Sequence, residues 1–193
     1  MKEVMVLKDP KVIKLVLNET RAQILFQFLT KRAMTVKQLS EALDKNPGSI
    51  LHHINKLKEA GLVELVKSRV APTGIVEKYY RAVARRFTYQ LGVMFKGPKS
   101  IADFATKHIT AIVNALEIFG IKIKENYKQE FIEDLIRVRD YEISIAEKID
   151  INDNVNVPDN IRADAFELAY NLILFQDEKY LKLKRKLLDY VVF

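Results

Sequence analysis

The chain has 193 residues, 49% of them hydrophobic, and no cysteine. That content can fill the core of one large domain or two small ones, and the missing cysteines exclude disulfides, thiolate zinc sites and cysteine nucleophiles. No apolar run approaches the roughly 18 residues that a membrane-spanning helix needs, and the first apolar stretch is too short for a secretory leader. The sequence therefore favours a cytoplasmic protein, and its 30% of charged residues without Trp leans toward a thermophile.

The positive charge is concentrated in the N-terminal part of the chain. Of the net charge of +7, residues 1–87 hold 17 Lys and Arg against 8 Asp and Glu, a balance of +9, and residues 88–193 hold 15 against 17, a balance of −2. A basic module joined to a near-neutral one suggests that the first module meets a polyanion. A solvated thermophilic surface would explain the same charge equally well.

The first predicted elements are two helices. Residues 12–30 carry apolar side chains at helical spacing, and Asn18 or Thr20 can cap the second part of that segment. In the string TVKQLSEALDK, Thr35 and Gln38 form a T-x-x-Q capping box, which marks the start of the next helix.

A third helix is predicted over residues 46–60. Asn46 is its N-cap and Pro47 takes the first helical position, where a missing N–H costs nothing. Gly61 can adopt the left-handed conformation in which helices often end.

The period of the sequence then changes to that of β-strands. Residues 62–70 and 75–83 are rich in β-branched and aromatic side chains. Between them, Pro72 suits the second position and Gly74 the fourth position of a tight turn. The two segments are therefore predicted to form a hairpin.

The remainder is predicted to be mainly helical. Residues 88–99 could be a strand or a linker, and helical spacing of apolar residues predicts long helices over 100–119, 124–149 and roughly 159–190, with a loop between the last two. The domain prediction is 1–87, a connection at 88–99, and a helical domain over 100–193.

The third helix has one apolar and one polar side. Ile50, Ile54 and Leu57 are predicted to face inward, with His53 at the edge of that side. The outer side offers Asn or His for base edges, Leu for a thymine methyl group, and Lys and Ser for phosphates, as a DNA major groove requires. An ordinary amphipathic helix with a solvated polar side is the alternative interpretation.

Residues 12–87 resemble the winged helix-turn-helix of ArsR-type transcriptional regulators. The matching strings are LVLNETRAQILFQFL, MTVKQLSEAL, NPGSILHHINKLKEAGLVE and EKYYRAV. The whole chain is similar to archaeal regulators that carry this module before a helical C-terminal domain. The resemblance implies a mainly α fold, an N-terminal winged helix-turn-helix of three helices plus a β-hairpin wing, followed by a C-terminal domain of long α-helices.

The resemblance also implies that the third helix lies in the major groove and the hairpin near the backbone or minor groove. The expected DNA-binding residues are Gln38, Gly48, Ser49, Leu51, His52, Asn55 and Lys56, with Lys67, Arg69, Thr73 and Lys78 on the wing. Metal-sensing members of the family place cysteines in the helix that corresponds to residues 35–44. This chain has none there, so metal sensing is not carried over.

No metal, cofactor or catalytic site is predicted. His52 and His53 point about 100° apart on a helix, so one metal cannot readily take both, and His108 is interpreted as an interior histidine. The string DINDNV lacks the glycine that a calcium loop has at its sixth position. Adjacent carboxylates such as Glu133 and Asp134 are interpreted as surface residues, and the chain is not expected to be an enzyme.

The C-terminal helices are predicted to form a homodimer interface. One helix-turn-helix reads few base pairs, and such proteins usually pair with recognition helices about 34 Å apart. The candidate surfaces are the apolar stripes at 101–119 and 161–188, and the alternative is a self-contained bundle on a monomer. A pocket for an unidentified small-molecule effector could lie among these helices.

The leading hypothesis is a dimeric, sequence-specific regulator that binds double-stranded DNA in the cytoplasm, at the nucleoid. The alternative is a winged helix that serves as a protein-interaction module in a larger assembly, without sequence-specific DNA binding.

Overall fold

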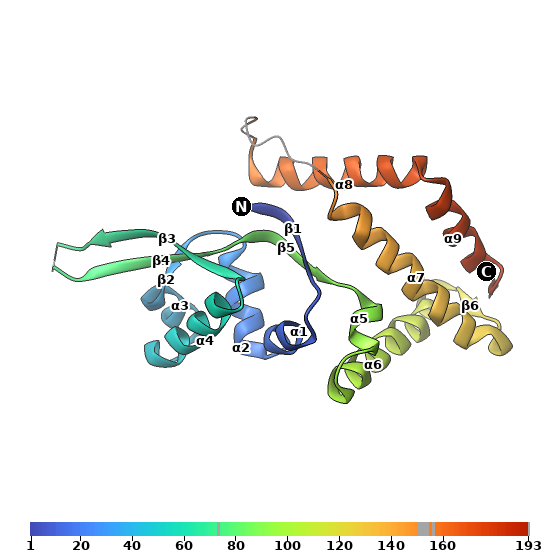
Figure 1. Ribbon diagram of the computed structural model, residues 1–193, viewed down its shortest axis with the longest axis horizontal. Coiled ribbons are helices and arrows are strands. Elements are labelled where there is room, and N and C mark those ends of the chain that lie inside the picture. The colour runs from blue at the N-terminus through green and yellow to red at the C-terminus, as the bar shows by residue number, and fades with distance from the viewer. Residues whose placement is uncertain (73, 150–154, 156, 193) are drawn as a thin grey trace. The chain divides into compact units, whose positions relative to one another are not determined.

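The structure is a computed structural model (Figure 1) that describes residues 1–72, 74–149, 155 and 157–192. It divides into two compact units, Met1–Thr88 and Tyr89–Phe193. Within the described residues, no helix is long and apolar enough to cross a membrane.

The helices of the first unit begin close to where the sequence predicts, although the first of them begins at Pro10, before the predicted segment 12–30. They are α1 (Pro10–Val16), α2 (Glu19–Ala22) with its π-helical continuation η1 (Gln23–Leu29), α3 (Val36–Leu43) and α4 (Pro47–Glu59). Asn18 accepts a 3.2 Å hydrogen bond from the Arg21 N–H at the start of α2. Both bonds of the Thr35–Gln38 capping box are present at the start of α3. These local predictions are confirmed.

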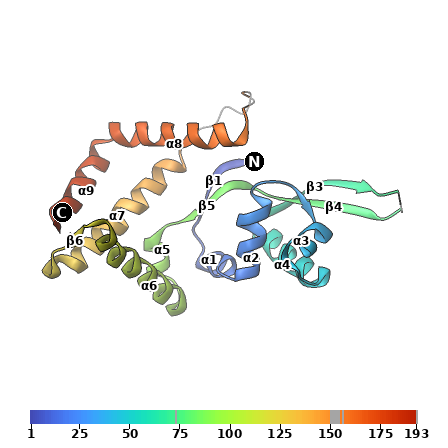
Figure 2. The same ribbon diagram turned by 180° about the vertical axis from the view of Figure 1, so that it is seen from behind.

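A three-stranded antiparallel sheet and a two-stranded sheet complete this unit. The strands are β1 (Lys2–Leu7), β2 (Met34–Thr35), β3 (Val63–Val70), β4 (Val76–Ala82) and β5 (Ala84–Tyr89). One sheet has the order β2-β4-β3, and the other pairs β1 with β5. The predicted hairpin is β3–β4, and Figures 1 and 2 show it extending well beyond the helices of its unit.

The core of the first unit is formed by apolar side chains from every one of its longer helices. Its fully buried members include Ile13, Ile24, Leu25, Leu29, Leu39, Ile50, Ile54, Leu57 and Leu62. The inner faces of α3 and α4 are thus fixed, and their other faces are left for solvent.

The second unit is built of helices. They are α5 (Leu91–Phe95), α6 (Lys99–Ala115) with the 3₁₀ turn η2 (Leu116–Phe119), the 3₁₀ turn η3 (Glu125–Tyr127), α7 (Lys128–Ala146), α8 (Asp159–Gln176) and α9 (Glu178–Leu188). The strands β6 (Lys122–Ile123) and β7 (Val191–Val192) pair antiparallel. Its core includes Val113, Phe131, Val138, Leu174, Tyr180, Leu187 and Tyr190. The predicted fold class, a mainly α chain with a winged helix-turn-helix and long C-terminal helices, is confirmed.

The prediction of one continuous helix over 159–190 is wrong. The chain breaks between α8 and α9 at Asp177, whose backbone is extended. Its carboxylate accepts a 2.9 Å hydrogen bond from the Tyr180 N–H, which makes it the N-cap of α9, and a 2.8 Å bond from the Tyr141 hydroxyl. An Asp followed by an acidic first turn is an ordinary helix start.

The stretch 88–99 contains the end of β5, the short helix α5 and the start of α6. The carboxylate of Asp140 on α7 accepts hydrogen bonds from the N–H groups of Leu91 (2.6 Å) and Gly92 (2.9 Å), and so caps α5. A Cβ atom on Gly92 would lie 2.7 Å from the same carboxylate. Glycine at this position therefore permits the cap.

Two further interpretations of side chains are wrong. His108 is exposed and stacks on Phe104 at 5.9 Å between ring centroids, because the buried line of α6 runs through its neighbour Ile109 at intervals of four residues. Asp134 is buried, whereas Glu133 is exposed. The loop predicted between the last two helices falls largely on residues 150–154 and 156, outside the described residues.

Candidate nucleic-acid interface

Helix α4 is held by its start, its inner face and its end. The Asn46 side chain accepts a 2.8 Å hydrogen bond from the Gly48 N–H. Ile50, Ile54 and Leu57 are fully buried, and Gly61 follows the helix with φ = 71°. These contacts fix the orientation of α4 in the first unit, so that the side opposite its buried residues faces outward.

The outward side of α4 is exposed along its length. Every residue that the sequence predicts for DNA contact on this helix is exposed, namely Gly48, Ser49, Leu51, His52, Asn55 and Lys56. Gln38 is exposed on the neighbouring helix α3, with its side-chain oxygen bonded to the Thr35 N–H. The polar side of α4 thus carries donors and acceptors together with positive charge, and the helix start itself favours an anion.

Gly48 has a local role that the sequence interpretation missed. A Cβ atom at this position would lie 3.1 Å from the side-chain oxygen of Asn46, which is the oxygen that caps the helix. The absence of a side chain makes room for the cap, as well as leaving the backbone accessible.

Additional cations lie near His53 on α4. The pKa of His53 is lowered by its burial and then by the nearby charges of Arg21, His52, Lys45 and Lys56. Arg21 and Lys45 were not among the predicted residues, because both lie outside the third helix, whose outward side was the basis of the prediction. Their proximity to His53 adds positive potential beside the outward face.

The predicted cations of the wing do not share one surface. Lys67 pairs with Tyr79 and Arg69 with Glu77 across the two strands, so these four side chains lie on the same face of the hairpin. Lys78 pairs with Ser68 and lies on the opposite face. Thr73 is outside the described residues.

The face with Lys67 and Arg69 has internal contacts. The Lys67 ammonium lies 5.9 Å from the centre of the Tyr79 ring, and the Tyr79 hydroxyl donates a 3.1 Å hydrogen bond to Glu77. That bond raises the pKa of Tyr79. Glu77 offsets part of the positive charge on this face, which the sequence interpretation had not considered.

The outer part of the wing also exposes apolar side chains. These residues are Leu65, Val66, Val70, Ile75 and Val76. The pairing register shifts between Leu65 and Lys67, so Val66 is an extra residue in β3, typical of a β-bulge. The Gly74 N–H donates to the Ala71 carbonyl at 2.8 Å, which is the bond expected between the fourth and first positions of the predicted turn. Gly74 has φ = 82°, a conformation that favours glycine.

A short turn between α3 and α4, an exposed second helix and a following hairpin together define a winged helix-turn-helix protein. Residues 18–64 match the family model of the bacterial regulatory protein, arsR family. The match spans α2 to the first residues of β3 and confirms the family resemblance over those residues. It supports a DNA-binding transcriptional regulator.

Three solved structures are among those similar to this chain. A possible transcriptional regulator from Methanosarcina mazei Go1 is 14% identical, with a TM-score of 0.33 over 57% of this chain and 82% of that one. The Lactococcus lactis protein ZitR, a mutant in apo form, is 20% identical, with a TM-score of 0.29 over 69% and 89%. The adhesin competence repressor AdcR from Streptococcus pyogenes is 16% identical, with a TM-score of 0.30 over 72% and 91%. No curated protein matches the chain.

The described residues contain no group of three or more His, Asp or Glu side chains that could hold a metal ion.

Proposed function

We propose that this protein is a sequence-specific, DNA-binding transcriptional regulator that acts as a homodimer. Helix α4 lies in the major groove of double-stranded DNA, and the β3–β4 wing lies on the backbone or the minor groove. The observation that carries the proposal is the outward face of α4, where Asn55, His52 and Lys56 are exposed on a helix whose other side is fixed in the core.

The roles differ along that face. Asn55 and His52 have hydrogen-bonding groups that match base edges, and Leu51 can contact a thymine methyl group. Lys56 and Ser49 suit phosphates, which fix position and carry no sequence information. Binding to DNA would hold the protein at the nucleoid in the cytoplasm.

The small DNA-contacting surface of one copy is the argument for a homodimer. One α4 helix covers few base pairs, and two copies related by a two-fold axis read half-sites about 34 Å apart. Exposed apolar side chains on the second unit offer the surfaces for pairing, including Phe104 and Ile112 on α6 and Leu168 and Leu172 on α8. An effector that acts through these helices stays a prediction from the sequence.

The test begins with selection of bound fragments from a random duplex pool, for which we expect a palindromic consensus. Affinity is then measured against salt concentration for single variants. Lys56→Ala should weaken binding to all sequences and reduce the salt slope by about 1. Asn55→Ala should cost about 1–3 kcal/mol on the consensus and relax the preference at one base pair. Lys148→Ala, at an exposed lysine of the other unit, is the matched control. Equal losses on every sequence from both α4 variants would contradict the assigned roles.

A second candidate function is favoured by the exposed apolar residues of the wing. Val70, Ile75 and Val76 suit a protein surface better than a phosphate backbone. The winged helix would then be an interaction module in a larger assembly. Absence of duplex binding at low salt, together with partner binding that survives charge reversal at Lys56, Lys67 and Arg69, would support this second candidate over the first.

A further inference from the structure

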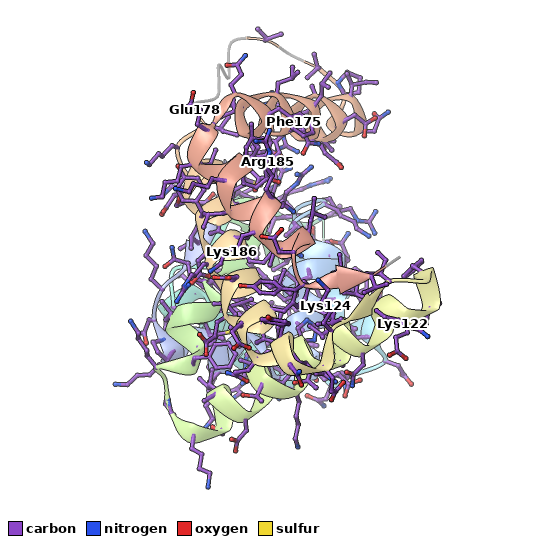
Figure 3. The ribbon with its side chains drawn as sticks, turned by 90° about the vertical axis from the view of Figure 1, so that its right-hand side faces the viewer. Lys122, Lys124, Phe175, Glu178, Arg185 and Lys186 are labelled. Carbon is purple, nitrogen blue, oxygen red and sulfur yellow. The ribbon has the colours of Figure 1, made fainter. Side chains whose placement is uncertain are left out.

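Helix α8 has apolar side chains on two opposite faces. One face packs inside the second unit, where Leu174 is buried and Tyr170 is partly buried against the core. On the other face, Ile161 is 50% exposed, Leu168 62%, Leu172 55% and Phe175 67%. Figure 3 shows Phe175 near the end of α8, just before the chain turns into α9. A helix that is apolar on both sides is normally covered on both sides.

The exposed face has the periodicity of a coiled-coil seam. Its members are Ile161, Ala165, Leu168, Leu172 and Phe175, and their spacing of 4, 3, 4 and 3 residues is that of alternating d and a positions in a heptad. None of the five is charged, and all five are exposed. This pattern indicates that the partner covering the seam is another helix with the same repeat. A flat partner surface would not require an apolar strip that is only one or two residues wide.

The charges around the seam favour a second copy of the same helix, in the opposite direction. The first half of α8 is acidic, with Asp159, Asp164 and Glu167 against Arg162, and residues 168–176 carry no charge. After Asp177 and Glu178 the chain becomes basic on α9, where Lys182 and Arg185 are exposed (Figure 3 labels Arg185). A parallel pair would place the two acidic halves side by side, whereas an antiparallel pair places each acidic half against the uncharged half of the other copy, with the basic part of that copy's α9 beyond it.

We propose that α8 is the self-association surface of this protein, and that it pairs antiparallel with α8 of a second copy through the seam of Ile161, Ala165, Leu168, Leu172 and Phe175. This deepens the homodimer of the proposed function by naming its interface and direction. It does not depend on DNA binding. A two-fold axis across the middle of α8 makes the contact self-complementary and closed.

The first test measures the mass of the full chain in solution by sedimentation across a range of concentrations. The wild type should be a dimer, and Leu168→Glu or Leu172→Glu should raise the dissociation constant at least tenfold, since each places a charge in the seam. Leu188→Glu is the matched control, because Leu188 on α9 is 59% exposed and lies outside the seam. Circular dichroism checks that every variant is folded, which is expected because these leucines are exposed within one copy.

Three outcomes would overturn the proposal. The wild type could be monomeric at all concentrations, the two seam variants could remain as dimeric as the control, or Phe104→Glu on α6 could dissociate the dimer when Leu168→Glu does not. The last outcome would assign the interface to α6.

The second test measures direction. Because the chain has no cysteine, Asn160→Cys and Asn171→Cys each provide a single site for a nitroxide label. In an antiparallel pair the labels at 171, near the middle, should be close, and those at 160 should be separated along the helix axis by roughly 20 Å or more, at 1.5 Å per residue. In a parallel pair both distances would be short, which would overturn the antiparallel arrangement.

DNA binding separates failure of this inference from failure of the proposed function. Asn55→Ala should leave the dimer intact and change DNA preference, whereas Leu168→Glu should produce a monomer that still binds a half-site, at least tenfold more weakly than the dimer binds the palindrome. A dimer through α8 that binds no duplex would sustain this inference and refute the function. Specific DNA binding by a dimer that survives Leu168→Glu would do the reverse.

Discussion

The hydroxyl of Tyr190 donates a 2.7 Å hydrogen bond to the carboxylate of Asp134, which is only 3% exposed on α7. The same arrangement recurs two turns further along that helix, where Glu142 accepts a 3.2 Å bond from the Tyr180 hydroxyl. Each carboxylate also contacts a lysine of α9, and the Lys186–Asp134 distance is 2.7 Å. Two buried carboxylates of α7 therefore stabilise the packing of the α9 segment on α7. A buried charge needs hydrogen-bonding or oppositely charged partners, and here tyrosine hydroxyls and lysine ammonium groups provide them.

Asp134→Ala should destabilise the C-terminal unit by about 1–3 kcal/mol, because Tyr190 and Lys186 lose their common acceptor. The free energy of unfolding in urea measures the loss. Glu133→Ala is the control on the same helix, since Glu133 is exposed and bonds only its neighbour Gln129 among the described contacts. Equal effects of the two variants would contradict the role assigned to Asp134.

The same carboxylate predicts a loss of stability in acid. Burial acts to raise the pKa of Asp134, but hydrogen bonds from Lys186 and Tyr190 outweigh it and hold the pKa below the usual 3.8. The ionised form is thus favoured in the folded state, so its contribution is complete above that value and disappears as the pH falls through the folded pKa. Asp134→Asn should lose this acid-dependent part of the unfolding free energy.

His53 predicts a pH dependence at a higher range, in the N-terminal unit. Burial and the nearby positive charge of Arg21 lower its pKa from the usual 6.5, and its Nδ1 atom is buried without a hydrogen-bond partner among the described residues. The unfolded chain therefore takes up a proton first as the pH falls, and stability should decline below about 6.5. Unfolding of His53→Gln at neutral and mildly acidic pH should show a smaller decline than the wild type. An unchanged decline would assign the effect to other groups.

The first unit was largely predictable because its signals are local. Thr35 and Gln38 are three residues apart, and Asn46 and Gly61 mark the two ends of one helix, so each signal needs only its neighbours in the chain. The pairing of β1 with β5 joins segments about 80 residues apart, and no local pattern in the first seven residues indicates that partner. The direction of long-range pairing depends on tertiary packing, which overrides local preference.

The second unit was less predictable because its polar side chains act across helices. From the sequence, Asp134 is expected to be a surface residue. In the fold it contacts Tyr190, which follows α9 and is 56 residues later in the chain. At the candidate site, the exposure of Asn55 and His52 follows from helical periodicity alone. The separation of Lys78 from Lys67 does not, since it depends on the strand register and on the extra residue Val66.

That separation leads to a prediction for the wing. Only one face of a hairpin can lie flat against a duplex, and the face with Lys67 and Arg69 carries two of the three predicted cations. Lys67→Ala and Arg69→Ala should each reduce the salt slope of DNA binding by about 1. Lys78→Ala should leave the slope nearly unchanged and is the matched control on the same hairpin. Three equal reductions would mean that the wing does not approach DNA by one face.

Gln38 allows its structural role to be separated from its predicted role in DNA binding. Its side-chain oxygen accepts a 2.9 Å hydrogen bond from the Thr35 N–H, while the Thr35 hydroxyl accepts a 3.2 Å bond from the Gln38 N–H. Gln38→Ala should therefore destabilise the N-terminal unit by about 1 kcal/mol through loss of the capping box. Gln38→Glu retains an acceptor at the same position and adds a negative charge near a helix N-terminus, which is favourable.

The free energy of unfolding of Gln38→Glu, measured in urea, should thus be at least as large as that of the wild type. Its affinity for duplex DNA should nevertheless fall at low salt, since a carboxylate replaces an amide donor beside phosphates, and the loss should shrink as added salt screens the repulsion. The comparison is decisive because stability and DNA binding move in opposite directions in one variant. A Gln38→Glu protein that binds DNA as tightly as the wild type would restrict Gln38 to the capping of α3.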